Sequence, residues 1–259
     1  RGFLAHTDLT PGGERRGMDA ALDPETVARL DRFWAERLGC MPGNLRQAGL
    51  TLTTLPDEGP GGIAIFDQGE SRVVAAPGSK IEELRGSEEA FRTDPADLDL
   101  QDLPLSPTAE LLGPQVIAYA TDETFRPVHD ANTRTLNRPA ADALRRLRTA
   151  CGEAWETRAD DIGFDSHDTL VGRFLGNDIV AAAAYRAESE RVARIATITH
   201  PDHRNRGFGT GAASAAVTEA LADDYVAECR PLEAWETAVD IATFLGFQRY
   251  GTAWRIANP

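Results

Sequence analysis

The stretch Ile195-Ala-Thr-Ile-Thr-His-Pro-Asp-His-Arg-Asn-Arg-Gly-Phe-Gly-Thr-Gly211 decides the fold that we expect for this chain. A β-rich run enters a loop with the pattern Arg-x-x-Gly-x-Gly, and a long alanine-rich helical segment follows. Glycines let the backbone approach a ligand closely, and the first turn of a helix has N–H groups without an internal partner. Because these donors lie at the positive end of the helix dipole, the stretch predicts a binding site for a pyrophosphate-like anion.

Two parts of the sequence resemble the GNAT superfamily of acyl-CoA-dependent N-acyltransferases. His200-Pro201 lead into Arg204-Asn-Arg-Gly-Phe-Gly209, which is similar to the family signature Arg/Gln-x-x-Gly-x-Gly/Ala after a strand. Downstream, Ala242-Thr-Phe-Leu-Gly-Phe247 resembles the helix of this family that closes with Leu-Gly-Phe. The resemblance runs from about residue 165 to the C-terminus. It implies an α/β (α+β) fold with a mixed, mostly antiparallel sheet flanked by helices.

Two other interpretations of the glycine loop compete with this one. Gly207-Phe-Gly-Thr-Gly-Ala212 also satisfies the dinucleotide fingerprint G-x-G-x-x-G/A. That fingerprint needs its glycines directly after a strand, whereas the polar and turn residues from His200 to Arg206 separate the apolar run from Gly207. The strands expected at 169–175, 179–186 and 192–199 are joined by short loops, as in antiparallel hairpins. A glycine turn that merely caps a helix is the third interpretation, and the acyl-CoA site is favoured over both.

The composition narrows the class of protein. The net charge of −14 argues against nucleic acid as a partner, because binding nucleic acid depends on neutralising phosphates. No apolar run approaches the roughly 20 residues of a membrane-spanning helix, so we expect no membrane association. Three distant cysteines without ligand or redox spacing indicate reduced thiols in a cytoplasmic protein without a metal site. An acidic, alanine-rich sequence with one lysine suits a halophile or a GC-rich genome.

The chain divides into three predicted parts: a flexible N-terminal extension at 1–17, an accessory region at 18–112 and a GNAT-like domain at 113–259. In the accessory region, Asp23 as N-cap and Gly39 at the end predict an amphipathic helix over 24–38. The acidic, proline-rich segment 86–113 is expected to have little regular structure. The other predicted elements are strands at 50–55, 62–66, 72–76, 116–120 and 225–232, and helices at 79–84 and 139–150.

The resemblance implies acetyl-CoA as co-substrate and assigns residues to it. Thr197, Ile198 and Thr199 are expected to pair with the pantetheine arm like an added strand, and N–H groups near Ile198 and Thr199 would polarise the thioester carbonyl. The main chain of the glycine loop would hold the pyrophosphate. Its residues are Arg204, Asn205, Arg206, Gly207, Phe208, Gly209 and Thr210.

The amine acceptor, a small molecule or a peptide, must lose a proton before it attacks the thioester. We expect Glu233, at the end of the strand 225–232, to be the general base, with Glu156 as the second candidate. Ala242 stands where many GNAT proteins have a tyrosine that acts as general acid, and Trp235 replaces an asparagine that often contacts pantetheine. These departures favour the alternative of a catalytically degenerate acyl-CoA sensor or scaffold. Homodimerisation is left open.

Overall fold

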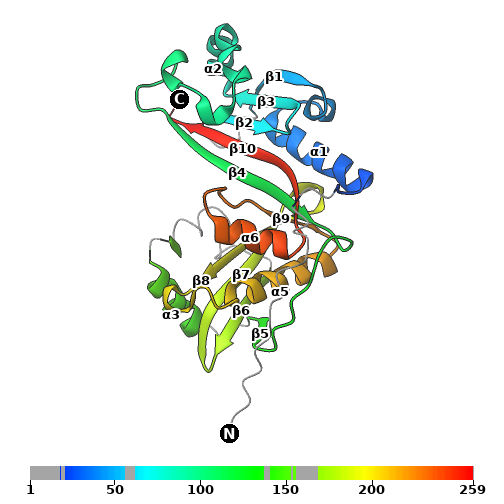
Figure 1. Ribbon diagram of the computed structural model, residues 1–259, viewed down its shortest axis with the longest axis vertical. Coiled ribbons are helices and arrows are strands. Elements are labelled where there is room, and N and C mark those ends of the chain that lie inside the picture. The colour runs from blue at the N-terminus through cyan, green and yellow to red at the C-terminus, as the bar shows by residue number, and fades with distance from the viewer. Residues whose placement is uncertain are drawn as a thin grey trace, which may run out of the picture.

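The computed structural model describes residues 18, 21–55, 62–136, 141–152, 154–155 and 169–258 (Figure 1). The N-terminal extension predicted at 1–17 lies outside these residues, as does Glu156. Among the described helices, none combines the length and the apolar character needed to cross a membrane.

One sheet of ten strands runs through the described part of the chain, in the order β1-β3-β2-β10-β4-β9-β8-β7-β6-β5. The pairs β1–β3 and β8–β9 are parallel, and the other seven pairs in this order are antiparallel. This arrangement confirms the mixed, mostly antiparallel α/β fold. The strands are β1 (Gly49–Thr54), β2 (Ile63–Asp67), β3 (Ser71–Ala76), β4 (Glu110–Ala120), β5 (Thr133–Thr135), β6 (Thr169–Leu175), β7 (Asp178–Ala187), β8 (Val192–Thr199), β9 (Val226–Cys229) and β10 (Gln248–Ala257).

Helices cover both faces of the sheet, because strand residues alternate between two apolar faces. On one face, α1 (Pro24–Leu38) and α3 (Ala141–Cys151) pack against buried side chains of the strands. On the other face lie α2 (Gly78–Leu84), α5 (Phe208–Ala222) and α6 (Glu236–Phe244). Short 3-10 helices complete the fold at Pro42–Leu45, Arg85–Ser87, Ala90–Arg92, Pro95–Asp97, Leu100–Asp102, Ser189–Arg191 and Pro201–His203.

The first helix shows how the local sequence sets the boundaries of an element. The carboxylate of Asp23 accepts hydrogen bonds from the N–H groups of Glu25 (3.0 Å) and Thr26 (2.9 Å), which caps α1. Gly39 ends the helix with a φ of 62°, a left-handed conformation that favours glycine. Both ends agree with the helix predicted over 24–38.

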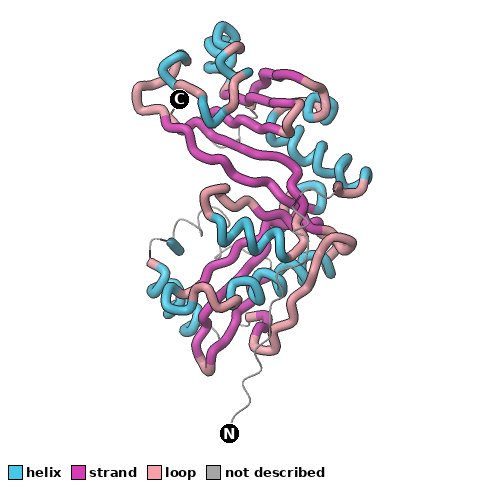
Figure 2. Tube along the Cα trace, viewed as in Figure 1, coloured by secondary structure: helices cyan, strands magenta, loops and turns pink. Residues whose placement is uncertain are grey.

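The long antiparallel pair of β4 and β10 joins the N-terminal strands to the rest of the sheet. Figure 2 shows the two strands running side by side between the ends of the molecule. The predicted domain boundary at 112/113 falls inside β4. Residues 86–113 contain four one-turn 3-10 helices, and Phe91 and Leu103 are buried against β2 and β3, so this segment contributes to the core.

Candidate active site

The parallel strands β8 and β9 separate after a short region of pairing. They pair at only three positions, from Val192↔Val226 to Arg194↔Glu228, whereas β8 continues to Thr199. On its other side, β8 stays paired with β7 as far as Thr199. The second half of β8 therefore has an edge that opens toward β9.

The hydrogen bonds of β8 with β7 show which backbone groups face this opening. The N–H of His200 donates to the carbonyl of Val180, and the N–H of Glu188 donates to the carbonyl of Val192, each at the margin of an unbroken antiparallel register. Because backbone groups alternate along a strand, even-numbered residues of β8 point to β7 and odd-numbered ones point to β9. The N–H and C=O groups of Thr197 and Thr199 thus face the opening, whereas those of Ile198 face β7.

The glycine loop brings the start of α5 against β8. Gly207 is the N-cap residue of α5 with a φ of 74°, and no side chain caps this helix. The first N–H groups of a helix have no intrahelical acceptor, so Phe208, Gly209 and Thr210 present donors at the helix start. A Cβ atom on Gly209 would lie 2.7 Å from Thr199 Oγ1, which shows how closely α5 approaches the strand.

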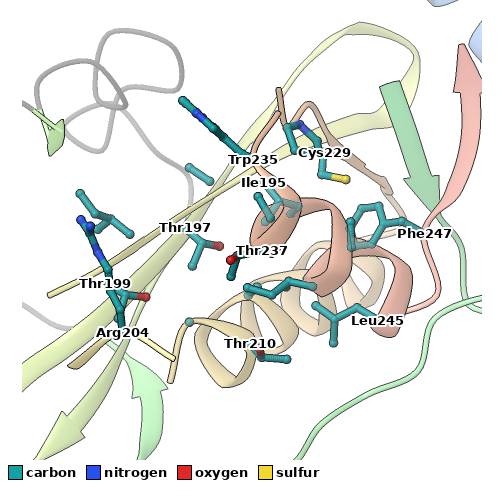
Figure 3. A pocket seen from close by; sticks show the side chains of 18 of the residues that line it. Ile195, Thr197, Thr199, Arg204, Thr210, Cys229, Trp235, Thr237, Leu245 and Phe247 are labelled. Atoms are coloured by element: carbon teal, nitrogen blue, oxygen red, sulfur yellow. The ribbon is translucent and has the colours of Figure 1, made fainter. Parts of the chain in front are cut away.

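A cavity of about 740 Å³ connects the opening to the helix start. Its lining includes every residue of β8 from Arg194 to Thr199, where β8 and β9 separate. Figure 3 shows Thr197, Thr199 and Arg204 on one side of it and Trp235 and Thr237 of the α6 segment on the other. Cys229, Leu245 and Phe247 also line it.

The motif Leu245-Gly-Phe247 follows the end of α6 with a turn that depends on glycine. Gly246 has a φ of 87°, and a Cβ atom there would collide with the carbonyl oxygen of Thr124. The N–H of Phe247 donates to the carbonyl of Ala242 at 3.0 Å. Glycine is required here because an L-residue would meet both an unfavourable φ and a backbone atom.

Charged side chains lie beside the cavity on the face that carries α1. Arg186, Arg194, Glu228 and Tyr119 occupy cross-strand neighbouring positions on β7, β8, β9 and β4. We call the arginine cluster the group formed by Arg37, Arg186, Arg194 and Arg230 with Glu188 and Glu228. Arg194 and Arg230 line the cavity.

The contacts of Glu228 hold the centre of the arginine cluster. This carboxylate is fully buried and accepts hydrogen bonds from Arg230 Nε (2.8 Å) and Nη2 (3.0 Å) and from the Tyr119 hydroxyl (2.5 Å). The indole N–H of Trp34 donates to the same hydroxyl at 2.7 Å. Helix α1 therefore supports a charged group next to the cavity.

Part of the chain matches a known family, and its fold has solved counterparts. Residues 128–247 match the acetyltransferase (GNAT) family. A GCN5-related N-acetyltransferase from Kribbella flavida has 16% identity and a TM-score of 0.51, and the match covers 90% of this chain and 95% of that one. A GCN5-related N-acetyltransferase-like protein from Streptococcus suis has 12% identity and a TM-score of 0.46, with coverages of 75% and 82%. No curated protein matches the sequence.

The match to the acetyltransferase (GNAT) family is confined to residues 128–247, just under half of the chain. Members of this family generally transfer an acetyl group from acetyl-CoA. The Kribbella flavida structure, at its low identity, supports the fold alone, and it does so across the N-terminal region as well as the GNAT domain.

Two observations test whether the cavity fits a CoA thioester. The Nδ1 atom of His203 is buried beside the glycine loop and has no hydrogen-bond partner within the described part of the chain, and this residue lines the cavity. The close approach of Gly209 to Thr199 leaves a narrow cradle that a side chain would fill. A polar atom without a partner and a cradle built on glycine both fit a phosphate-bearing ligand.

Most residues that the sequence predicts for the cofactor site line this one cavity. They are Thr197, Ile198, Thr199, Arg204, Asn205, Gly207, Phe208, Gly209 and Thr210. Arg206 is exposed and is not part of the lining.

Neither of the two predicted bases is among the described residues that line the cavity. Glu233 is exposed outside the lining, and its carboxylate lies 3.3 Å from Arg249 Nη1. Glu156 is outside the described residues, although Ala154, two positions earlier, lines the cavity. The predicted strand 225–232 is shorter in the structure and ends at Cys229, before Pro231, which has no N–H for a strand ladder.

The lining residues that were not predicted from the sequence include Arg194, Arg230, Cys229 and Glu236. A charged residue inside the apolar run Val192-Ala-Arg-Ile-Ala196 is a sequence signal that points to Arg194, because a strand in the middle of a sheet seldom buries an arginine without a partner.

Proposed function

We propose that this protein is an acetyl-CoA-dependent N-acetyltransferase that moves an acetyl group to an amine by direct attack on the thioester. The observation that carries the proposal is the single cavity that joins the start of α5 to the opening between β8 and β9. Phosphate-binding donors and exposed strand groups thus lie along one continuous path.

The chain's own residues divide the binding of acetyl-CoA between two elements. The N–H groups at the start of α5, from Phe208 to Thr210, bind the pyrophosphate, and the helix dipole adds to this attraction. The N–H and C=O groups of Thr197 and Thr199 pair with the pantetheine arm. An N–H at this edge polarises the thioester carbonyl, a contribution that is commonly worth about 3 kcal/mol to the transition state.

The environment of Cys229 favours direct attack over an acetyl-cysteine intermediate. Burial, followed by the negative charge of Glu228, raises the pKa of the Cys229 thiol well above its ordinary value. The thiolate is the nucleophilic form of cysteine, so a thiol that stays protonated is a poor nucleophile. The amine itself is then the attacking group.

A carboxylate at the start of α6 or just before it takes the proton from the amine. The sequence points to Glu233, whereas Glu236, in the first turn of α6, lines the cavity and is the better placed of the two. Glu156 is the remaining candidate. A base must come within hydrogen-bond reach of its proton, directly or through one water, so a residue that lines the cavity is favoured.

The leaving thiolate needs no assigned acid in this proposal. Ala242 is buried where many relatives carry a tyrosine, and among the described residues no tyrosine lines the cavity. Thiols have an ordinary pKa near 8.5, so a thiolate leaves more readily than an alkoxide. If the absence of this tyrosine abolishes turnover, the protein binds acyl-CoA without transferring the acyl group and acts as a sensor or scaffold.

Free CoA release from acetyl-CoA, measured against a panel of amines, tests the proposal. We expect amine-dependent release, with initial-rate lines that intersect as both substrates are varied, because direct attack requires a ternary complex. Parallel lines would point to a covalent enzyme intermediate. Binding of acetyl-CoA without release by any amine would favour the sensor or scaffold.

A matched pair of substitutions identifies the base. Glu236→Gln should lower kcat by about 100-fold and remove the ascending limb of the pH profile, since general-base catalysis contributes about 10²–10⁴-fold. Glu233→Gln serves as the comparison, because it makes the same change in charge and size outside the cavity. A large loss with Glu233→Gln alone would assign the base to Glu233.

A further inference from the structure

The start of α5 is held by contacts with two strands of the sheet. On the side of β8, Gly209 lies close to Thr199. On the side of β6, the guanidinium carbon of Arg173 lies 3.9 Å from the centroid of the Phe208 ring, which is within the range of a cation–π contact. Phe208 is the first residue of α5 and one of the proposed donors to the pyrophosphate. Arg173 therefore contacts the phosphate-binding turn from the strand β6.

A largely buried ion pair fixes the side chain of Arg173. Its Nε atom donates to Asp130 Oδ2 at 3.0 Å, and its Nη1 atom donates to the carbonyl of Phe174 at 2.8 Å. The other carboxylate oxygen of Asp130 accepts a hydrogen bond from the N–H of Asn132 at 2.9 Å. The side chains of Arg173 and Asp130 are only 11% and 18% exposed. Because both partners are anchored, the guanidinium group has little freedom to leave the ring of Phe208.

Asp130 connects this ion pair to a second point on α5. A Cβ atom on Gly211 would lie 3.1 Å from Asp130 Oδ2, so the carboxylate packs directly against the first turn of the helix. In the same segment, the N–H of Val128 donates to Ser214 Oγ at 2.8 Å. Arg173 and the segment 128–130 thus hold α5 from the side of β6, while Gly209 holds it against β8.

The charges of the pair matter for an anion that binds at the start of α5. A carboxylate against this turn repels a pyrophosphate at the nearby N–H groups, because like charges interact strongly where water is excluded. The positive charge of Arg173, 3.0 Å from Asp130, offsets this repulsion. A buried ion pair often contributes no more stability than an apolar pair of similar size. Stability alone therefore does not explain why these two charges occur here.

We propose that Arg173 is a positioning residue for the binding of acetyl-CoA. It holds Phe208 through the ring and offsets the charge of Asp130, so that the N–H groups at the start of α5 stay directed at the pyrophosphate. Neither Arg173 nor Asp130 is among the described residues that line the cavity, so both act through α5. The inference rests on the proposed function and names residues outside the cavity that decide its affinity for acetyl-CoA.

Two acetyl donors separate this role from a purely structural one. Acetyl-CoA and S-acetylpantetheine share the thioester and the pantetheine arm, but only acetyl-CoA has the pyrophosphate. Arg173→Gln should lower kcat/KM for acetyl-CoA at least about tenfold through a higher KM, because it leaves the charge of Asp130 uncompensated. With S-acetylpantetheine, kcat/KM should stay within about twofold of the wild type, since uniform binding of the pyrophosphate no longer contributes. An equal loss with both donors, or no loss with either, would overturn the proposal.

A second variant removes both charges and guards against misfolding of the first. Arg173→Gln combined with Asp130→Asn leaves no unpaired carboxylate, so it should bind acetyl-CoA more tightly than Arg173→Gln alone and less tightly than the wild type. A double variant that binds no better than Arg173→Gln would overturn the charge offset. If Arg173→Gln does not fold, the double variant takes its place in the comparison of donors, and a loss confined to acetyl-CoA supports the proposal.

The neighbouring strand β5 offers a matched control. The guanidinium carbon of Arg134 lies 4.0 Å from the centroid of the Phe174 ring, a contact of the same kind that involves neither the start of α5 nor the described lining of the cavity. Arg134→Gln should keep the wild-type kcat/KM with both donors. A loss in Arg134→Gln as large as that in Arg173→Gln would overturn the assignment to Arg173.

Calorimetry distinguishes a failure of this inference from a failure of the proposed function. If no amine is acetylated, the proposed function fails, and CoA and pantetheine are titrated into the wild-type protein and Arg173→Gln. An affinity for CoA at least about tenfold weaker in the variant, with pantetheine binding unchanged, would still support the positioning role. The wild-type affinity for CoA in folded Arg173→Gln would overturn it.

Discussion

Replacing Gly209 by valine should damage the acetyl-CoA cradle more than any single change of a charged side chain in the loop. A Cβ atom at this position would lie 2.7 Å from Thr199 Oγ1 and 3.7 Å from Thr197 Cγ2, so the first added carbon already overlaps the strand. Valine adds two further methyl groups in the same narrow space. Relief requires α5 to move away from β8, which separates the two elements that bind acetyl-CoA.

These distances set the size of the expected effect of Gly209→Val on stability and on acetyl-CoA affinity. Overpacking of this kind costs about 1–3 kcal/mol of unfolding free energy. We expect the affinity for acetyl-CoA to fall at least tenfold, which corresponds to about 1.4 kcal/mol. The loss should be larger than that caused by Arg206→Gln, since Arg206 is exposed and outside the cavity lining.

Isothermal titration calorimetry with acetyl-CoA measures this prediction, with circular dichroism melting as the test of folding. Gly43→Val is the matched control, because a Cβ atom there would have no neighbour within 4 Å and the residue lies in a distant 3-10 helix. Gly43→Val should bind acetyl-CoA like the wild type. A folded Gly209→Val protein with the wild-type dissociation constant would refute the assignment of the cradle.

Three further predictions concern stability, and urea unfolding measures each. Gly246→Ala should cost at least about 2 kcal/mol, because alanine would combine a positive φ with a collision against the carbonyl oxygen of Thr124; a neutral effect would contradict the geometry of the turn. Tyr119→Phe should lower the free energy of unfolding by about 1–3 kcal/mol, because the buried hydroxyl of Tyr119 both accepts and donates a hydrogen bond. A variant at least as stable as the wild type would contradict this. Burial raises the pKa of Asp130, but hydrogen bonds from a backbone N–H and from Arg173 outweigh this and lower it overall. The ionised Asp130 carboxylate therefore stabilises the fold fully above the unfolded-state pKa near 3.9, and this stabilisation is lost as the pH falls through the lower folded-state pKa. The loss of unfolding free energy caused by Asp130→Asn should therefore shrink between about pH 5 and pH 2. A loss that is the same across this range would contradict the assignment.

Local signals explain what the sequence could predict. The bounds of β6 and β8 and both ends of α1 agree with the prediction, since each rests on nearby residues such as Asp23 and Gly39. The glycine loop was equally readable, because its spacing fixes where the helix begins. These features depend on contacts within a few residues.

Contacts between distant segments explain what the sequence could not predict. The pairing of β4 with β10 joins residues more than a hundred positions apart, and it places the predicted boundary at 112/113 inside one continuous sheet. The arginine cluster is harder still, because Arg194, Glu228 and Tyr119 meet only through the order of the strands. Glu233 was chosen from its position after a strand, and that position could not show that its side chain pairs with Arg249 outside the cavity.

A crystal structure of the protein with acetyl-CoA tests the central claim most directly. We expect the pyrophosphate at the N–H groups of residues 208–210 and the thioester between β8 and β9, with its carbonyl toward the open edge of β8 at Thr197 and Thr199. Acetyl-CoA bound outside this cavity, or a pyrophosphate distant from the start of α5, would contradict the account.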